Sequence, residues 1–89
     1  MSAEIPVETL AAIEKIVRQV LERRQQSLGR RFTYARDFAV KYYYAVTRDL
    51  RGYKQDLIDA YSSWGLDIEV LEEIAELLEK RYGKRREEV

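Results

Sequence analysis

Apolar residues recur every three or four positions along most of this 89-residue chain, which is the spacing of an amphipathic α-helix. The clearest stretch is residues 33–50, which holds five of the ten aromatic residues. One side of this predicted helix is apolar and consists of Ala35, Phe38, Ala39, Tyr42, Val46 and Leu50. The opposite side carries Lys41, Tyr44, Arg48 and Arg51. The first side predicts a core, and the second predicts a surface that can bind a partner.

A first helix is predicted over residues 6–28. Pro6 suits its first turn, because the N–H that proline lacks would have no partner there. An apolar seam follows, formed by Leu10, Ile13, Val17, Val20 and Leu21. Gly29 then predicts a left-handed C-terminal cap, and Thr33 is expected as the N-cap of the second helix.

Two further helices are predicted after Gly52, which either ends the second helix or kinks it. The third helix, over residues 53–64, is expected to bury Leu57, Ala60, Tyr61 and Trp64. Asp67 is expected to cap a fourth helix over residues 67–82. Its predicted inner side is Leu71, Ile74, Ala75, Leu78 and Tyr82, and its outer side is Glu69, Glu72, Glu73, Glu76 and Glu79.

The fold class that these patterns predict is all-α. We expect a compact bundle of four helices, in which helices two and three are either separate or one kinked helix. The length suits a single domain over residues 1–89, with a frayed tail at 84–89.

The composition narrows the classes of activity. Hydrophobic residues make up 46% and charged residues 36%, a balance typical of a folded domain. Without cysteine or histidine, a disulfide framework, a thiolate nucleophile, the commonest general base and the usual zinc sites are excluded. We therefore expect no enzyme activity, no metal and no cofactor. No apolar run could span a membrane and no signal-peptide pattern opens the chain, so a cytoplasmic location without a membrane partner is expected.

The charges are sorted along the chain, although the net charge is zero. Residues 22–54 contain nine basic and three acidic residues, whereas residues 55–79 contain eight acidic residues and no basic one. Two interpretations remain open. The blocks pair with each other inside the domain, or they form two faces of opposite potential.

The candidate binding surface lies on the second helix. Arginine and tyrosine are enriched at binding hot spots, so Tyr44 is the predicted anchor and the cations are expected to steer an acidic partner. The predicted partner-binding residues are Lys41, Tyr43, Tyr44, Arg48 and Arg51. The function predicted from them is a protein–protein interaction or assembly module. Its partner is an acidic protein surface or a second copy of the chain, which would make a homodimer.

A second hypothesis assigns the same surface to single-stranded nucleic acid, since cations and exposed aromatic rings suit phosphates and unstacked bases. Further cations available to that surface are Arg23, Arg24, Arg30, Arg31 and Lys54.

The origin of the chain is also open. All four glycines lie at predicted helix ends, a local consistency typical of designed proteins and of proteins from hyperthermophiles. Three consecutive tyrosines, at 42–44, favour a natural chain instead.

Overall fold

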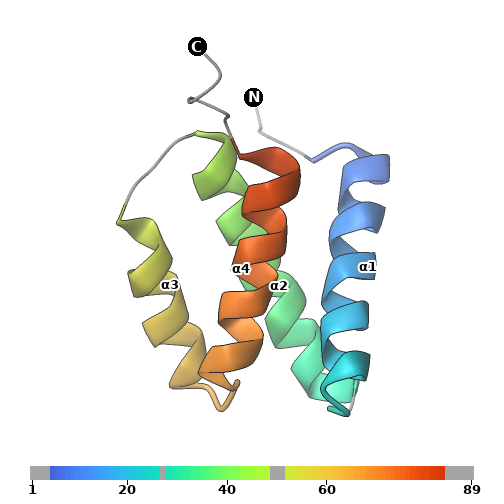
Figure 1. Ribbon diagram of the computed structural model, residues 1–89, viewed down its shortest axis with the longest axis vertical. Coiled ribbons are helices and arrows are strands. Elements are labelled where there is room, and N and C mark those ends of the chain that lie inside the picture. Colours follow the sequence, from blue (N-terminus) through green and yellow to red (C-terminus); the bar gives the residue numbers. More distant parts are fainter. Residues whose placement is uncertain (1–4, 27, 49–51, 84–89) are drawn as a thin grey trace.

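The computed structural model describes residues 5–26, 28–48 and 52–83, and within these ranges it contains four helices and no strand (Figure 1). The helices are α1 (Val7–Arg23), α2 (Gly29–Thr47), α3 (Tyr53–Ser62) and α4 (Ile68–Tyr82). The predicted all-α bundle of four helices is thereby confirmed.

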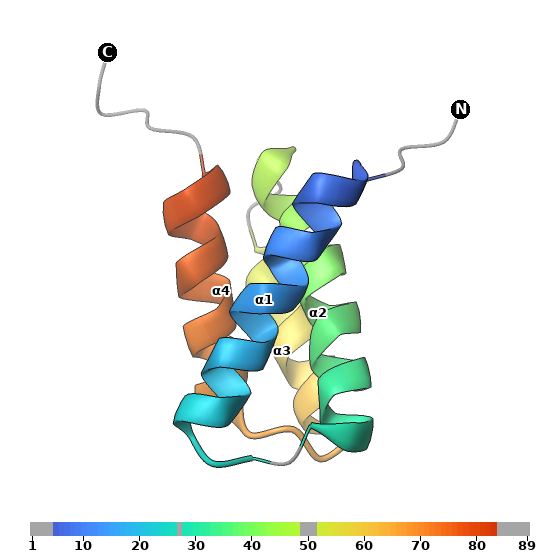
Figure 2. The ribbon, with the colours of Figure 1, turned by 90° about the vertical axis from the view of Figure 1, so that its right-hand side faces the viewer.

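Helices α2 and α4 each have the other three helices as neighbours. These two helices contact each other, and both contact α1 and α3, whereas α1 and α3 do not touch within the described residues. Seen from the side, α2 and α4 lie at opposite edges of the bundle (Figure 2). The outer face of α2 therefore points away from the outer face of α4.

Helices α2 and α3 are separate and antiparallel. Tyr34, near the start of α2, contacts Trp64, just after the end of α3, with ring centroids 5.4 Å apart. A single kinked helix would carry these two rings apart, so the kinked-helix alternative is excluded. Gly52, with φ at +83°, stands directly before α3 in a left-handed conformation that costs glycine little.

The core is made of apolar side chains from all four helices, and no polar or charged residue among the described ones is buried. Phe38 lies near its centre, fully buried, stacked on Tyr42 at 5.8 Å and edge-on to Tyr61 at 5.6 Å. Most predicted core positions are confirmed as buried: Ile13, Val17, Val20, Leu21, Ala35, Phe38, Ala39, Tyr42, Leu57, Tyr61, Leu71, Ile74, Ala75 and Leu78.

Some predicted core positions are wrong. Ala60 is exposed and Trp64 is 55% exposed, whereas Val46, Leu10 and Tyr82 are only partly buried. Trp64 lies beyond the end of α3 at Ser62, so helical spacing no longer sets the direction of its side chain. Leu50 lies outside the described residues. The pattern also missed four buried residues: Ala45, Ile58, Leu66 and Val70.

The boundary between the first two helices differs from the prediction, because α1 ends at Arg23 and Gly29 begins α2. Gln25 adopts the left-handed conformation, with φ at +58°, that was expected of Gly29. The N–H of Gln26 donates to the carbonyl of Leu21 at 2.8 Å, and the N–H of Gln25 donates to Glu22 at 3.0 Å. This pair of bonds is a Schellman motif, which satisfies the last carbonyls of α1 and stops it five residues early.

The remaining boundaries need smaller corrections. Thr33 lies inside α2 and caps nothing, since that helix begins four residues before it. Asp67 is the N-cap residue of α4 as predicted, but its side chain forms no capping bond and instead accepts a hydrogen bond from Gln26 at 3.3 Å. The predicted fraying at 84–89 falls outside the described residues. None of the described helices combines the length and apolarity that crossing a bilayer requires.

Candidate functional site

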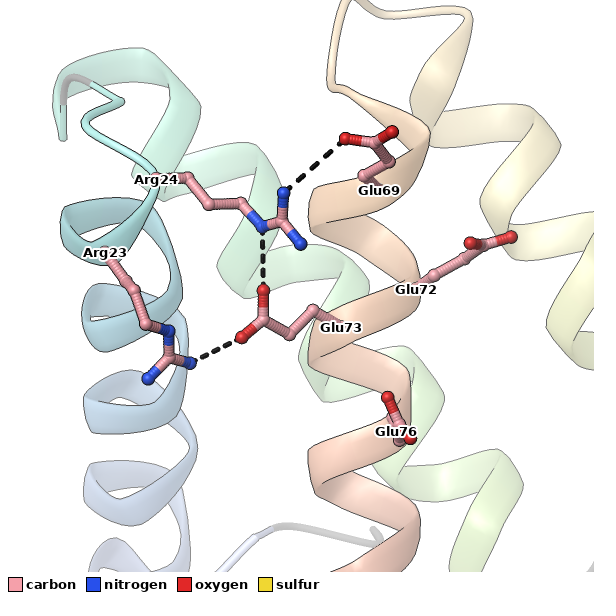
Figure 3. A pocket seen from close by; sticks show the side chains of 6 residues that line it. All are labelled: Arg23, Arg24, Glu69, Glu72, Glu73 and Glu76. Carbon is pink, nitrogen blue, oxygen red and sulfur yellow. Dashed lines mark hydrogen bonds and ion pairs between the residues drawn. The ribbon is translucent and has the colours of Figure 1, made fainter.

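The acidic side chains nearest to α1 are paired with arginines at the end of that helix. Arg23 bonds Glu73 at 2.5 Å, and Arg24 bonds the other oxygen of Glu73 at 2.7 Å (Figure 3). Arg24 also lies 3.5 Å from Glu69. Burial alone would raise the pKa of Glu73, but the hydrogen bonds from both arginines outweigh it and lower that pKa. This flank of α4 is therefore neutralised by α1.

The opposite flank of α4 is paired with α3 and with the core. Lys54 of α3 lies 3.6 Å from Glu79, and the buried Tyr42 donates its hydroxyl hydrogen to the same carboxylate. Three acids of α4, Glu69, Glu73 and Glu79, are therefore paired inside the domain. Their partners are Arg23, Arg24 and Lys54, however, and not the cations on the outer face of α2.

Lys41, the first predicted site residue, belongs to a network between α2 and α3. Its ammonium donates to Asp37 at 3.1 Å and to the Tyr61 hydroxyl at 3.0 Å, while that hydroxyl donates to Asp37 at 2.5 Å. The Tyr61 hydrogen bond is the main reason why the pKa of Asp37 is lowered, and it is also the main reason why the pKa of Lys41 is raised. Both groups stay charged over a wide pH range, and the Lys41 side chain remains half exposed.

Tyr44 and Arg48 lie together one and two turns further along α2. The guanidinium carbon of Arg48 is 4.7 Å from the centre of the Tyr44 ring, within the range of a cation–π interaction. Arg48 is exposed and forms no ion pair with the described part of the chain. Lys41, Tyr44 and Arg48, at spacings of three and four, therefore share one face as predicted.

Tyr43 does not belong to that face. Its ring packs edge-on against Tyr82 of α4 at 5.0 Å and is half buried. Successive residues of a helix are separated by about 100° around its axis, so three consecutive tyrosines must point in different directions. The fifth predicted residue, Arg51, lies outside the described residues.

Trp64 is a surface aromatic that the sequence pattern placed in the core. Its ring is held between Tyr61 at 4.8 Å and Tyr34 at 5.4 Å, yet more than half of the side chain is exposed. The Lys41 ammonium lies 5.7 Å from the centre of the Tyr61 ring, so Trp64 continues the surface that Lys41 begins. Trp64 lies two residues beyond the end of α3, so a correct prediction of that helix end would have indicated that helical spacing does not bury its side chain.

These residues lie along one side of α2 and just beyond the end of α3, and we call this surface the α2–α3 face. Its members combine two cations with three aromatic rings that other rings or a cation hold in place: Tyr34, Lys41, Tyr44, Arg48 and Trp64. Within the described ranges, no group of three acidic side chains is arranged to hold a metal ion. The groups that the face exposes are positive charges and aromatic rings.

Comparison of the chain with protein-family models, with curated proteins and with solved structures gave no match.

Proposed function

We propose that this chain is a non-enzymatic protein–protein interaction or assembly module, and that it binds an acidic protein surface through the α2–α3 face. Three of the residues predicted from sequence, Lys41, Tyr44 and Arg48, contribute to this face. Trp64 and Tyr34 join them, whereas Tyr43 packs elsewhere.

The observation that carries the proposal is the pattern of ion pairing. Three acids of α4, Glu69, Glu73 and Glu79, are paired with arginines at the end of α1 or with Lys54 of α3. None of the acids of α4 pairs with Lys41 or Arg48 in the described structure. Among the described residues, Lys41 bonds Asp37 and Tyr61, and its side chain is 52% exposed. Both cations are therefore available to attract and orient an acidic partner.

The aromatic rings suit the role of anchors. Tryptophan and tyrosine dominate binding hot spots because they bury a large area while losing few rotatable bonds. Trp64 is already held between Tyr34 and Tyr61, and Tyr44 is already stacked by Arg48. Ordering these side chains on binding would therefore cost little entropy.

The titratable groups of the face support binding more than catalysis. In the Asp37–Lys41–Tyr61 network each group is hydrogen bonded to the other two, which lowers the pKa of Asp37 and raises the pKa of Lys41, so that both stay charged at neutral pH. The chain also has no histidine or cysteine that could serve as a base or nucleophile at neutral pH.

Single-stranded nucleic acid is the second candidate ligand. The exposed ring of Trp64, beside cations, is suited to stacking on a base. Three acids weigh against this candidate: Asp37 on the face itself, and Asp56 and Asp59 exposed on the neighbouring α3. They would repel a phosphate backbone that crosses α3, and an acidic protein partner avoids the same repulsion only if it lies along the α2 side of the face.

Trp64 allows a direct test, since it is the only tryptophan and lies on the face. Its fluorescence would be followed while the protein is titrated with a polyglutamate peptide and, separately, with a random single-stranded oligonucleotide. The test variant is Lys41→Gln/Arg48→Gln. The control variant is Lys15→Gln/Lys80→Gln, which removes the same charge from exposed positions of α1 and α4.

We expect the peptide to bind the wild type and the control equally, and the test variant about tenfold more weakly. Equal binding to both variants would refute the site. Binding of the oligonucleotide alone, with an affinity that falls steeply with salt, would replace the proposal with the nucleic-acid candidate. No response to either ligand would refute both.

A further inference from the structure

The outer face of α4 is a second charged surface, which we call the α4 face and define as Glu69, Glu72, Glu76 and Lys80. All four residues are exposed. Glu72, Glu76 and Lys80 form no ion pair among the described residues, and Glu72 points away from the arginines of α1 (Figure 3). Glu69 lies 3.5 Å from Arg24, yet its side chain is 81% exposed. The acids of this face are therefore open to a partner.

The order of charges along α4 is complementary to the order along α2 when the two helices run antiparallel. On α2, Asp37, Lys41 and Arg48 follow one another at intervals of four and seven residues. On α4, Glu69, Glu76 and Lys80 follow at intervals of seven and four. Seven residues span about 10 Å along either helix, so the spacing also agrees in distance.

An antiparallel alignment places three opposite charges against one another: Arg48 against Glu69, Lys41 against Glu76, and Asp37 against Lys80. A parallel alignment brings only two pairs together, Lys41 with Glu69 and Arg48 with Glu76, because the position then opposite Asp37 is Gly65. The antiparallel arrangement is therefore favoured.

One chain cannot pair these two faces with each other, because α2 and α4 lie at opposite edges of the bundle (Figure 2), and the α4 face lies towards α1 whereas the α2–α3 face lies towards α3. We propose that the acidic partner of the α2–α3 face is the α4 face of a second copy, and that chains associate head to tail into open-ended strings. This inference rests on the function proposed above. Each added chain leaves one basic and one acidic face unused, so the contact is heterologous and does not close as a twofold dimer.

The association is weak and depends on salt. A contact made by one helix face on each side lies at the small, transient end of protein interfaces, and its ion pairs are exposed. By sedimentation we expect monomers at about 10 μM and a mass that keeps rising towards about 1 mM. The rise should disappear when salt is raised from about 0.02 M to about 0.5 M.

Two variants that each lose one face test the head-to-tail geometry. Lys41→Gln/Arg48→Gln neutralises the basic face, and Glu69→Gln/Glu76→Gln neutralises the acidic face, all at exposed positions. We expect each variant alone to stay monomeric. Their mixture should form a particle of two chains, twice the 10.6 kDa chain mass, and no larger one. Lys15→Glu on α1 serves as a charge control and should associate as the wild type does.

The direction of the contact can be tested by cross-linking, because the chain has no cysteine of its own. A mixture of the Arg48→Cys chain with the Glu69→Cys chain should form an intermolecular disulfide faster than a mixture of Arg48→Cys with Glu76→Cys. The reverse preference would refute the antiparallel alignment.

The outcomes separate this inference from the proposed function. A wild type that is strictly monomeric at every concentration and salt would overturn self-association, while binding of polyglutamate to the α2–α3 face would still stand. A closed dimer at all concentrations, or association unchanged in both one-face variants, would overturn the head-to-tail contact. A wild type that neither self-associates nor binds polyglutamate would overturn the two proposals together.

Discussion

Replacing Tyr61 with phenylalanine tests the network that holds Lys41 on the α2–α3 face. The Tyr61 side chain is 3% exposed, so the ring of Tyr61→Phe keeps its place in the core and only the hydroxyl is lost. Two hydrogen bonds disappear with it, the 2.5 Å bond to Asp37 and the 3.0 Å bond from Lys41.

The loss of stability should be modest. Each hydrogen bond to a charged group contributes about 1.5–3 kcal/mol when it is well shielded. Here the side chains of Lys41 and Asp37 are each about half exposed, and in the variant they can bond to water and to each other. We therefore expect the free energy of unfolding to fall by about 1–2 kcal/mol. In a domain of this size, each kcal/mol lowers the Tm by about 4–8 °C.

The variant should also change the response to acid. The pKa of Asp37 in the folded protein is lowered, chiefly by the Tyr61 hydrogen bond, so this carboxylate stabilises the fold at pH values above its unfolded pKa. That stability is lost as the pH falls through the lowered, folded value. Without the hydroxyl the folded pKa returns towards its usual value, so Tyr61→Phe should lose less stability than the wild type between about pH 7 and about pH 2.

Urea unfolding at both pH values measures the stability, and carboxyl-carbon NMR measures the pKa of Asp37 directly. The matched control is Tyr42→Phe, which also removes a hydroxyl from a buried tyrosine, but one that bonds Glu79. The reasoning is refuted if the Asp37 pKa is the same in Tyr61→Phe and the wild type, or if it rises equally in Tyr42→Phe.

Three further predictions concern the bundle itself. The pKa of Tyr42 is raised, mainly by burial, so the wild type should lose stability above about pH 10 more steeply than Tyr42→Phe, and equal thermal unfolding profiles would contradict this. Phe38→Ala should lower the free energy of unfolding in urea by about 3–5 kcal/mol, whereas Val7→Ala, at an 81% exposed position, should change it by less than about 0.5 kcal/mol. Similar losses in the two variants would contradict the position of Phe38 in the core. Gly65→Ala should cost about 1–2 kcal/mol, because φ is +105°, a conformation that is strained for alanine; no steric clash adds to this cost, since a Cβ would meet no atom within 4 Å. The helical Gly29→Ala should not destabilise, and thermal unfolding that ranks the two variants oppositely would contradict the turn geometry.

The sequence predicted the four-helix fold well because helical spacing directly reports which side chains share a face. It failed where something other than spacing decides. Gln25 takes a left-handed conformation usually given to glycine, which shortens the first helix. Trp64 lies in a turn, where periodicity no longer applies, and Tyr43 points away from Tyr44 because neighbouring residues diverge around the helix axis.

The charge blocks show the same limit. Their separation along the chain is visible in the sequence, but the choice of partner depends on how the helices are arranged. Because α1 and α3 flank the pair of α2 and α4, the acids of α4 meet Arg23, Arg24 and Lys54 before any cation of the α2–α3 face. Without knowing which helices are neighbours, sequence reasoning could not decide between internal pairing and two open faces. The structure contains internal ion pairs between helices as well as exposed charges on the α2–α3 face and on α4.

The most direct test of the α2–α3 face is an NMR titration of the ¹⁵N-labelled protein with a polyglutamate peptide at low salt, at about 10 μM protein, where we expect monomers whose α4 face is unoccupied. We predict that the largest shift changes fall on the backbone amides from Lys41 to Arg48 and on the indole N–H of Trp64, while the amides from Glu69 to Glu76 stay in place. Changes confined to another part of the bundle, or none at saturating peptide, would contradict the proposal that this face recognises an acidic partner.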